Sequence, residues 1–174
     1  MAYTSAQIVQ AVPTGINSAL VLISSTTIGT TVSSVTVSSA FSATYDNYLI
    51  TISGGVASTG CNLTLVMGAT TTGYNSGLIY SSYTTTVQAV GGTNGSSFAR
   101  VGNGDTNVLY MNCILQNPFL ATRTIFSGSF ANSGDFGPVG GYLTNATSYT
   151  AFTVAPSSGT ITGGTIRVYG YTNS

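Results

Sequence analysis

The sequence predicts an all-β protein, an antiparallel β-sandwich of the jelly-roll type. Val and Ile dominate the aliphatic residues and Thr, Ser and Tyr the polar ones, a mixture typical of pleated, half-buried strands. Lys and Glu are absent, and other helix formers are scarce. The 22 glycines recur along the whole chain and indicate frequent turns. The connections between strands are then too short for the helical crossovers of a parallel sheet. A length of 174 residues fits one domain with its own core.

The first 18 residues are expected to form an N-terminal arm, and residues 19–174 the sandwich domain. Pro13-Thr14-Gly15 marks a turn near the end of the arm. Strand candidates then follow at close spacing, each bounded by turn-forming residues. They are Leu20–Ile28, Val32–Val37, Tyr48–Ser53, Asn62–Met67, Leu78–Tyr83, Ser97–Val101, Val108–Gln116, Thr122–Phe130, Gly141–Thr144, Tyr149–Ala155 and Ile166–Tyr171.

Alternation within three of these segments predicts which face is buried. In Tyr48–Ser53, Ile50 and Ile52 share one face; in Asn62–Met67 the leucines share a face with Met67. In Ile166–Tyr171 the two aliphatic residues point the same way. The segment Gly91–Gly95 has no such pattern and is predicted to be a loop.

Charge is nearly missing from the chain. Only 3% of the residues are charged, and three Arg balance three Asp. An ordinary soluble domain is about one-quarter charged and remains soluble partly through its surface ions. A surface of uncharged Ser, Thr, Asn and Gly indicates a chain that works packed in an assembly.

The composition argues against an enzyme. Nucleophilic catalysis needs a base beside the nucleophile, and without His, Lys or Glu only Asp46, Asp105 and Asp135 remain. Each of the three lies in a turn-like context, Asp105 in Gly102–Thr106 and Asp135 in Ser133–Gly137, where Asp commonly bonds its own backbone. A hydrolase that pairs these carboxylates is the least favoured hypothesis.

Metal, cofactor and nucleic-acid sites are not expected. Two Cys without His make no zinc site, and no loop has calcium-binding spacing. Three scattered Arg cannot neutralise a phosphate backbone. No apolar stretch reaches the ~18 residues of a membrane span, and no secretory leader is evident. Cys61 and Cys113 are interpreted as buried free thiols, although one bridge between them is formally open.

The remaining candidates for function are the arginines and the 11 tyrosines. Arg100, Arg123 and Arg167 are expected to meet an Asp or backbone carbonyls. Tyr74, Tyr80 and Tyr83 lie in a Ser-, Thr- and Gly-rich region typical of adaptable recognition loops, and are the candidate ligand-facing aromatics. The alternative is that they pack at strand ends.

Three stretches of the sequence resemble small virion proteins of tailed bacteriophages, particularly those of marine and cyanobacterial phages. They are Val12–Leu20, Phe41–Ile50 with its Tyr45-Asp46-Asn47-Tyr48 phrase, and Gly159–Tyr171 with its terminal Tyr169-Gly170-Tyr171. The resemblance implies a jelly-roll sandwich, a trimer, and display on the head or tail of the virion.

These observations lead to two hypotheses for function. The first is a virion structural protein, a capsid decoration or cement subunit that packs on the major capsid protein. In it the arm, through Ile8, Val9, Val12 and Ile16, binds the partner. The second is a tail-fibre or receptor-binding module, lectin-like, which holds a host glycan with the tyrosines.

Overall fold

The computed structural model describes residues 19–173, and within them every regular element is a strand. The predicted all-β antiparallel class is confirmed. The strands are β1 Leu20–Thr27, β2 Val35–Val37, β3 Asn47–Ser53, β4 Val56–Ala57, β5 Cys61–Met67, β6 Tyr74–Ser82, β7 Val87–Gly95, β8 Phe98–Gly104, β9 Leu109–Gln116, β10 Ile125–Ala131, β11 Asp135–Leu143, β12 Phe152–Pro156, β13 Ile161–Thr162 and β14 Thr165–Tyr171.

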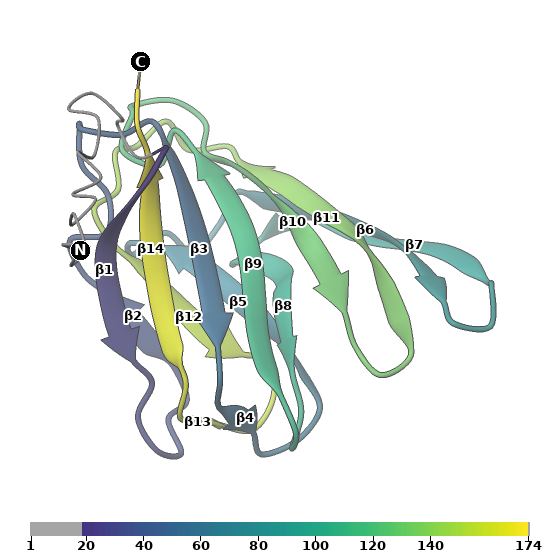
Figure 1. The fold of residues 1–174 in the computed structure, drawn as a ribbon. Coiled ribbons are helices and arrows are strands. Elements are labelled where there is room, and N and C mark those ends of the chain that lie inside the picture. The colour runs from purple at the N-terminus through teal and green to yellow at the C-terminus, as the bar shows by residue number, and fades with distance from the viewer. Residues whose placement is uncertain (1–18, 174) are drawn as a thin grey trace, which may run out of the picture.

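The strands form two layers, visible in Figure 1. One layer has the order β1-β14-β3-β9 and continues through β10-β11-β6-β7. The other has the order β2-β12-β5-β8 and lies behind the first four strands. A small ladder of β4 and β13 lies at the lower end in this view.

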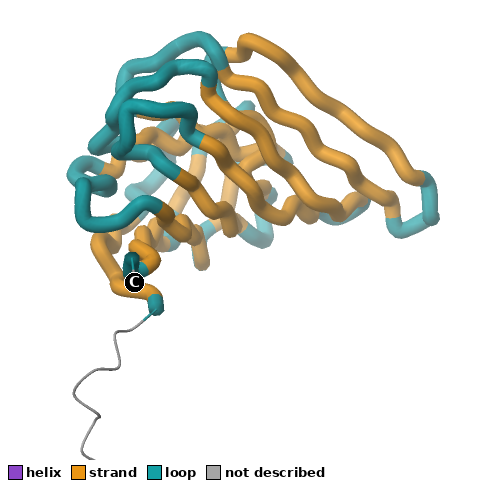
Figure 2. Tube along the Cα trace, turned by 90° about the horizontal axis from the view of Figure 1, so that it is seen from above, coloured by secondary structure: helices purple, strands orange, loops and turns teal. Residues whose placement is uncertain are grey.

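Strand β9 joins the two layers because its two halves have different partners on one edge. Leu109–Met111 pair with β8, whereas Cys113–Gln116 pair with β10. The opposite edge of β9 pairs with β3. The four strands β10, β11, β6 and β7 therefore diverge from the sandwich, and we call them the wing. Figures 1 and 2 both show the wing extending past the second layer.

The core is formed by the faces that the alternation predicts. Ile50 and Ile52 of β3 are buried with the three apolar residues of β5, Leu63, Leu65 and Met67. Ile166 and Val168 of β14 join the same cluster. Burying these aliphatic side chains stabilises the fold by roughly 1.5–3 kcal/mol each.

A second aromatic cluster anchors the base of the wing. The ring of Phe98 on β8 lies 4.9 Å from Tyr74 on β6 and 4.6 Å from Phe126 on β10, measured between ring centroids. All three side chains are fully buried. The wing is thus held on β8 by its inner face, while no strand in the described part of the chain covers its outer face.

The prediction of a loop at Gly91–Gly95 is wrong. These residues are the second half of β7 and pair with β6, with Gly91 opposite Gly77 and Gly92 opposite Ser76. Backbone hydrogen bonds need no side chains, so a glycine-rich segment can form a strand that shows no alternation.

Gly102 and Gly104, interpreted from sequence as part of a turn, are buried in β8 instead. A Cβ on Gly102 would lie 2.3 Å from the carbonyl oxygen of Tyr110 on β9. Asp105 does form a turn, because its Oδ1 accepts hydrogen bonds from the backbone N–H groups of Asn107 and Val108. The turn interpretation is confirmed for Asp105 and wrong for the two glycines.

Candidate functional site

The outer face of the wing has two parallel rows of residues with different heights. One row consists of Pro138, Ile79 and Ala89, on β11, β6 and β7. The other row is displaced by two residues along each strand. It consists of the glycines Gly140, Gly77 and Gly91, which are neighbours in the ladder. We call the first row the ridge and the second the trough.

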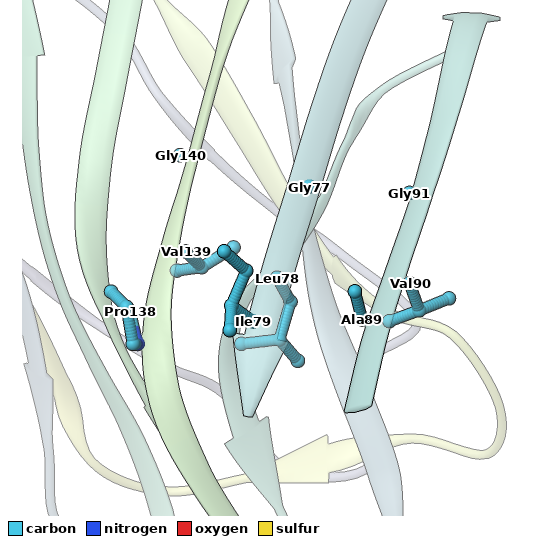
Figure 3. A pocket seen from close by; sticks show the side chains of 9 residues that line it. All are labelled: Gly77, Leu78, Ile79, Ala89, Val90, Gly91, Pro138, Val139 and Gly140. Carbon is cyan, nitrogen blue, oxygen red and sulfur yellow. The ribbon is translucent and has the colours of Figure 1, made fainter. Parts of the chain in front are cut away.

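The trough forms two shallow, open hollows that share its three glycines. One hollow, of about 640 Å³, lies toward the ridge, whose side chains Figure 3 shows beside the bare backbone of the trough. The other, of about 570 Å³, lies toward Asn75, Thr93 and Tyr142. Most of the lining of both hollows is apolar or backbone.

Large apolar side chains surround the trough and are exposed to solvent. Ile79 is 61% exposed and Val87 is 72% exposed. The rings of Tyr83 and Phe136 contact each other at 5.3 Å near the tip of the wing, and both are exposed. Ile125 and Tyr142 are exposed at the opposite end of the same face. Exposed apolar groups concentrated on one face mark an interaction surface.

Strand β7 is the last strand of the sheet among residues 19–173, and within them it has a free edge. It pairs with β6 on one side, and the strand order stops there. Its sequence, Val87–Gly95, contains neither a charged residue nor a proline. Such an edge offers unpaired backbone N–H and C=O groups to another strand.

A separate polar cleft lies between the second layer and the β10–β11 turn. Its main part, about 280 Å³, is lined by Asn62, Asn103, Asp105, Asn132, Ser133 and three further residues. The structure uses several of these polar groups internally. Asn103 donates from Nδ2 to the Cys61 carbonyl at 2.8 Å, and Asn132 Oδ1 accepts from the backbone N–H groups of Gly134 and Asp135.

The polar cleft continues into a smaller hollow of about 220 Å³. Arg100, Asp135, Tyr80 and Asn132 are among the residues that line it. Arg100 has a φ of 60°, in the left-handed region that non-glycine residues rarely occupy. This φ falls where the β5–β8 ladder shifts register, between the Leu63–Gly102 and Leu65–Phe98 pairs, and such a bulge changes the direction of a side chain.

The three tyrosines expected to face a ligand lie in three different environments. Tyr74 is buried, and its hydroxyl accepts from the Met67 N–H at 2.7 Å and donates to the Thr70 carbonyl. It is therefore a core residue, since its ring is needed in the aromatic cluster. Tyr80 lines the polar cleft and donates to Gln88 Oε1 at 2.8 Å. Tyr83 is exposed on the wing.

Sequence reasoning missed the residues that accompany Tyr80 and Tyr83. Asn132 reaches the cleft from the β10–β11 turn and Asp135 from the start of β11. Phe136, the next residue of β11, meets Tyr83. These residues are about fifty positions away from the tyrosines in the chain, and no local pattern connects them.

Two of the three arginines meet partners other than carboxylates. Arg167 donates from Nη1 to Ser53 Oγ at 2.9 Å on the neighbouring strand. The guanidinium of Arg123 lies 5.3 Å from the ring centroid of Tyr142, a cation–π geometry. For these two, the expected Asp or carbonyl partner is replaced by a hydroxyl and a ring.

Cys61 and Cys113 are free and buried, as expected. Burial raises the pKa of both thiols, that of Cys113 to about 12. A thiol that stays protonated is a poor nucleophile and a poor metal ligand. Both cysteines therefore act as small apolar side chains.

Several expectations fall on the N-terminal arm. Its residues Ile8, Val9, Val12 and Ile16 lie outside the described residues. Across residues 19–173, no three His, Cys, Asp or Glu side chains gather into a group suited to a metal ion. The same residues contain no helix of the length and hydropathy that a membrane span requires.

The chain was compared with protein-family models, curated proteins and solved structures. None of the three gives a match. The surfaces of the wing and the polar cleft, together with the sequence, are therefore the basis for assigning a function.

Proposed function

We propose that this chain is a non-enzymatic structural subunit of a bacteriophage virion, a decoration or cement subunit that packs on the assembled head. Its partners are other copies of itself and virion proteins such as the major capsid protein. The observation that carries this proposal is the wing, whose largely apolar outer face and free strand edge project from the sandwich.

The wing is unsuited to a chain that diffuses alone. Natural sheets protect an edge strand with Lys, Pro or inward charges, because a bare edge recruits other strands. Strand β7 carries neither Lys nor Pro, and side chains such as Val87 and Ile79 are exposed beside it. In an assembly, neighbouring subunits cover such groups, and burial of each large apolar side chain contributes about 1.5–3 kcal/mol.

The resemblance to phage virion proteins supports the same proposal. Two of the three resembling stretches, Phe41–Ile50 and Gly159–Tyr171, lie side by side because β3 pairs with β14. Tyr48 is opposite Gly170 in that ladder. These two stretches thus form one structural unit.

The test is to locate the chain on purified particles of the phage by cryo-EM with copy-number quantification. We expect a high copy number on the head lattice. A variant that lacks residues 1–18 should keep the circular dichroism spectrum of the full chain and lose occupancy on particles, because the arm is the proposed attachment segment. Absence of the full chain from particles would overturn the proposal, and full occupancy without the arm would overturn the role of the arm.

A second candidate function is glycan recognition at the tail, and the polar cleft favours it. Asn and Asp side chains beside a tyrosine are the groups that hydrogen-bond and stack on sugar rings. A glycan array with the purified chain tests this candidate. If it is correct, Tyr80→Ala abolishes the signal, while Tyr142→Ala, on the opposite face of the wing, does not. A few copies at the tail would agree with it, and an array without signal would contradict it.

A further inference from the structure

We propose that the outer face of the wing is a self-association surface, on which the same face of a second copy of this chain docks. The inference deepens the proposed function and rests on it for a place in the particle. The association itself is a property of the purified chain and is testable without the particle.

The outer face of the wing is complementary to itself in shape. The ridge and the trough are separated by two residues along each strand, about 7 Å. A two-fold axis between the two rows and parallel to them places the ridge of one copy over the trough of the other. Ile79 of each copy then lies over Gly77 of its partner, and both contacts form at once. A surface with adjacent parallel high and low rows is in this way complementary to itself, as a two-fold interface requires.

Gly77, in the middle of the trough, has space around it for a side chain. A Cβ on Gly77 would come no closer than 3.9 Å to any other residue, and the atom it meets is the Val90 carbonyl oxygen. By contrast, a Cβ on Gly137 or Gly141 would lie 2.0 or 2.1 Å from a backbone oxygen of β6. The fold thus requires glycine at 137 and 141 but has room for a side chain at 77. Glycine in a strand interior weakens the strand and often marks the close approach of another chain, which accounts for Gly77.

The charge and the area of the outer face both suit a contact between two copies. Asp135 on β11 lines the polar cleft instead of the trough, and Arg123 lies over Tyr142 at the end of the outer face away from Phe136. The two-fold axis places that end over the Phe136 end of the partner, so the two Arg123 side chains do not face each other. Four strands about 4.8 Å apart and about eight residues long cover about 500 Å². Two such faces bury about 1,000 Å², which reaches the lower limit for a specific interface. The contact joins two copies, unlike the trimer that the resemblance implies.

The experiment is sedimentation velocity of the full chain over a range of concentrations, with two matched variants. Gly77→Thr fills the trough on the outer face. Gly92→Thr is the control. The backbone of Gly92 borders the second hollow, but its ladder partner is Ser76, so a side chain at 92 points to the other face of the wing, where a Cβ meets nothing within 4 Å. Thr suits a strand, so both variants should keep the circular dichroism spectrum of the parent chain.

We expect a dimer whose dissociation constant rises at least about ten-fold in Gly77→Thr, equal to about 1.4 kcal/mol, and stays unchanged in Gly92→Thr. If Gly77→Thr does not fold, Ile79→Ser, at an exposed position, gives the same test from the ridge. A chain that is monomeric at every concentration would overturn the proposal. A trimer would also overturn it, as would a dimer whose dissociation constant is the same in the parent chain and in the trough and ridge variants.

The outcomes separate this inference from the proposed function. A monomeric chain that is nevertheless abundant on particles refutes the self-association surface and leaves the structural role standing. A trough-dependent dimer that is absent from particles refutes the structural role and leaves the surface standing.

Discussion

The ring of Tyr45 lies directly on the backbone of Gly170. A Cβ on Gly170 would be 2.5 Å from Cγ of that ring, closer than any side chain could be. Tyr45 also contacts Tyr48 edge to face at 6.0 Å, and Tyr48 is the ladder partner of Gly170. The segment before β3 is thereby fixed to the last strand, β14.

We expect Gly170→Ala to lower the free energy of unfolding by about 1–3 kcal/mol, because the added methyl group displaces the Tyr45 ring. Urea denaturation measures the effect. Gly60→Ala is the control, since a Cβ there meets nothing within 4 Å, and it should change stability by less than about 0.5 kcal/mol. In the double variant Tyr45→Ala/Gly170→Ala the two losses should not add; simple additivity would refute the contact.

Alkaline pH should destabilise the fold. Burial raises the pKa of Cys113 from 9.0 to about 12 and that of Tyr74 from 10.0 to about 12. The unfolded chain therefore loses these protons at lower pH than the folded chain does. Between pH 9 and 12 the unfolded chain therefore binds fewer protons than the folded chain. The contribution of these two groups to the free energy of unfolding is fully present below that range and is lost as pH rises through it. The loss is at most about 1.4 kcal/mol per pH unit for each group.

Denaturation midpoints across this pH range test the prediction. Cys113→Val removes one titrating group and should make the alkaline loss of stability shallower. An identical pH profile for the variant would contradict the role of Cys113.

Thr124→Val should stabilise the protein by about 1 kcal/mol. The Thr124 side chain is fully buried, and its Oγ1 has no hydrogen-bond partner within residues 19–173. Removing a buried unpaired hydroxyl removes its desolvation cost, and Val has nearly the same shape. Thermal unfolding of Thr124→Val beside Thr122→Val, which changes an exposed position in the same segment, measures the gain. A loss of stability in Thr124→Val alone would refute the assignment.

Tyr74→Phe and Tyr80→Phe should differ although the change is the same. Tyr74→Phe leaves the buried Met67 N–H and the Thr70 carbonyl without the hydroxyl, which should cost about 1–3 kcal/mol. Tyr80→Phe removes a solvent-exposed hydrogen bond to Gln88 and should cost less than about 0.5 kcal/mol. Equal midpoints in urea would contradict the distinction between a core tyrosine and a cleft tyrosine.

Strands were predictable where one face is buried and the other is not. Strands β3, β5 and β14 alternate regularly, and each was placed to within a residue or two because burial on a pleated sheet has a period of two. Strand β7 was missed because most of its residues are exposed and no alternation arises. A strand held by backbone pairing alone has no periodic signal in the sequence.

The candidate sites were less predictable than the strands. Tyr74, Tyr80 and Tyr83 looked equivalent in a Ser- and Thr-rich segment, yet they lie in the core, in the polar cleft and on the wing. Tyr80 and Tyr83 are partnered there by Asn132 and Phe136, on another hairpin. Pairing of β6 with β11 creates these neighbours, and no local pattern records it.

By itself the sequence determined an uncharged, antiparallel all-β chain with a conventional alternating core, since composition and a period of two are local properties. Only the tertiary structure decided that β9 changes partners along its edge, so that β10, β11, β6 and β7 leave the sandwich as a wing. It also brought Gly140, Gly77 and Gly91 into one trough. These features depend on the register between distant strands, and register is set by which side chains pack together after the sheets have formed.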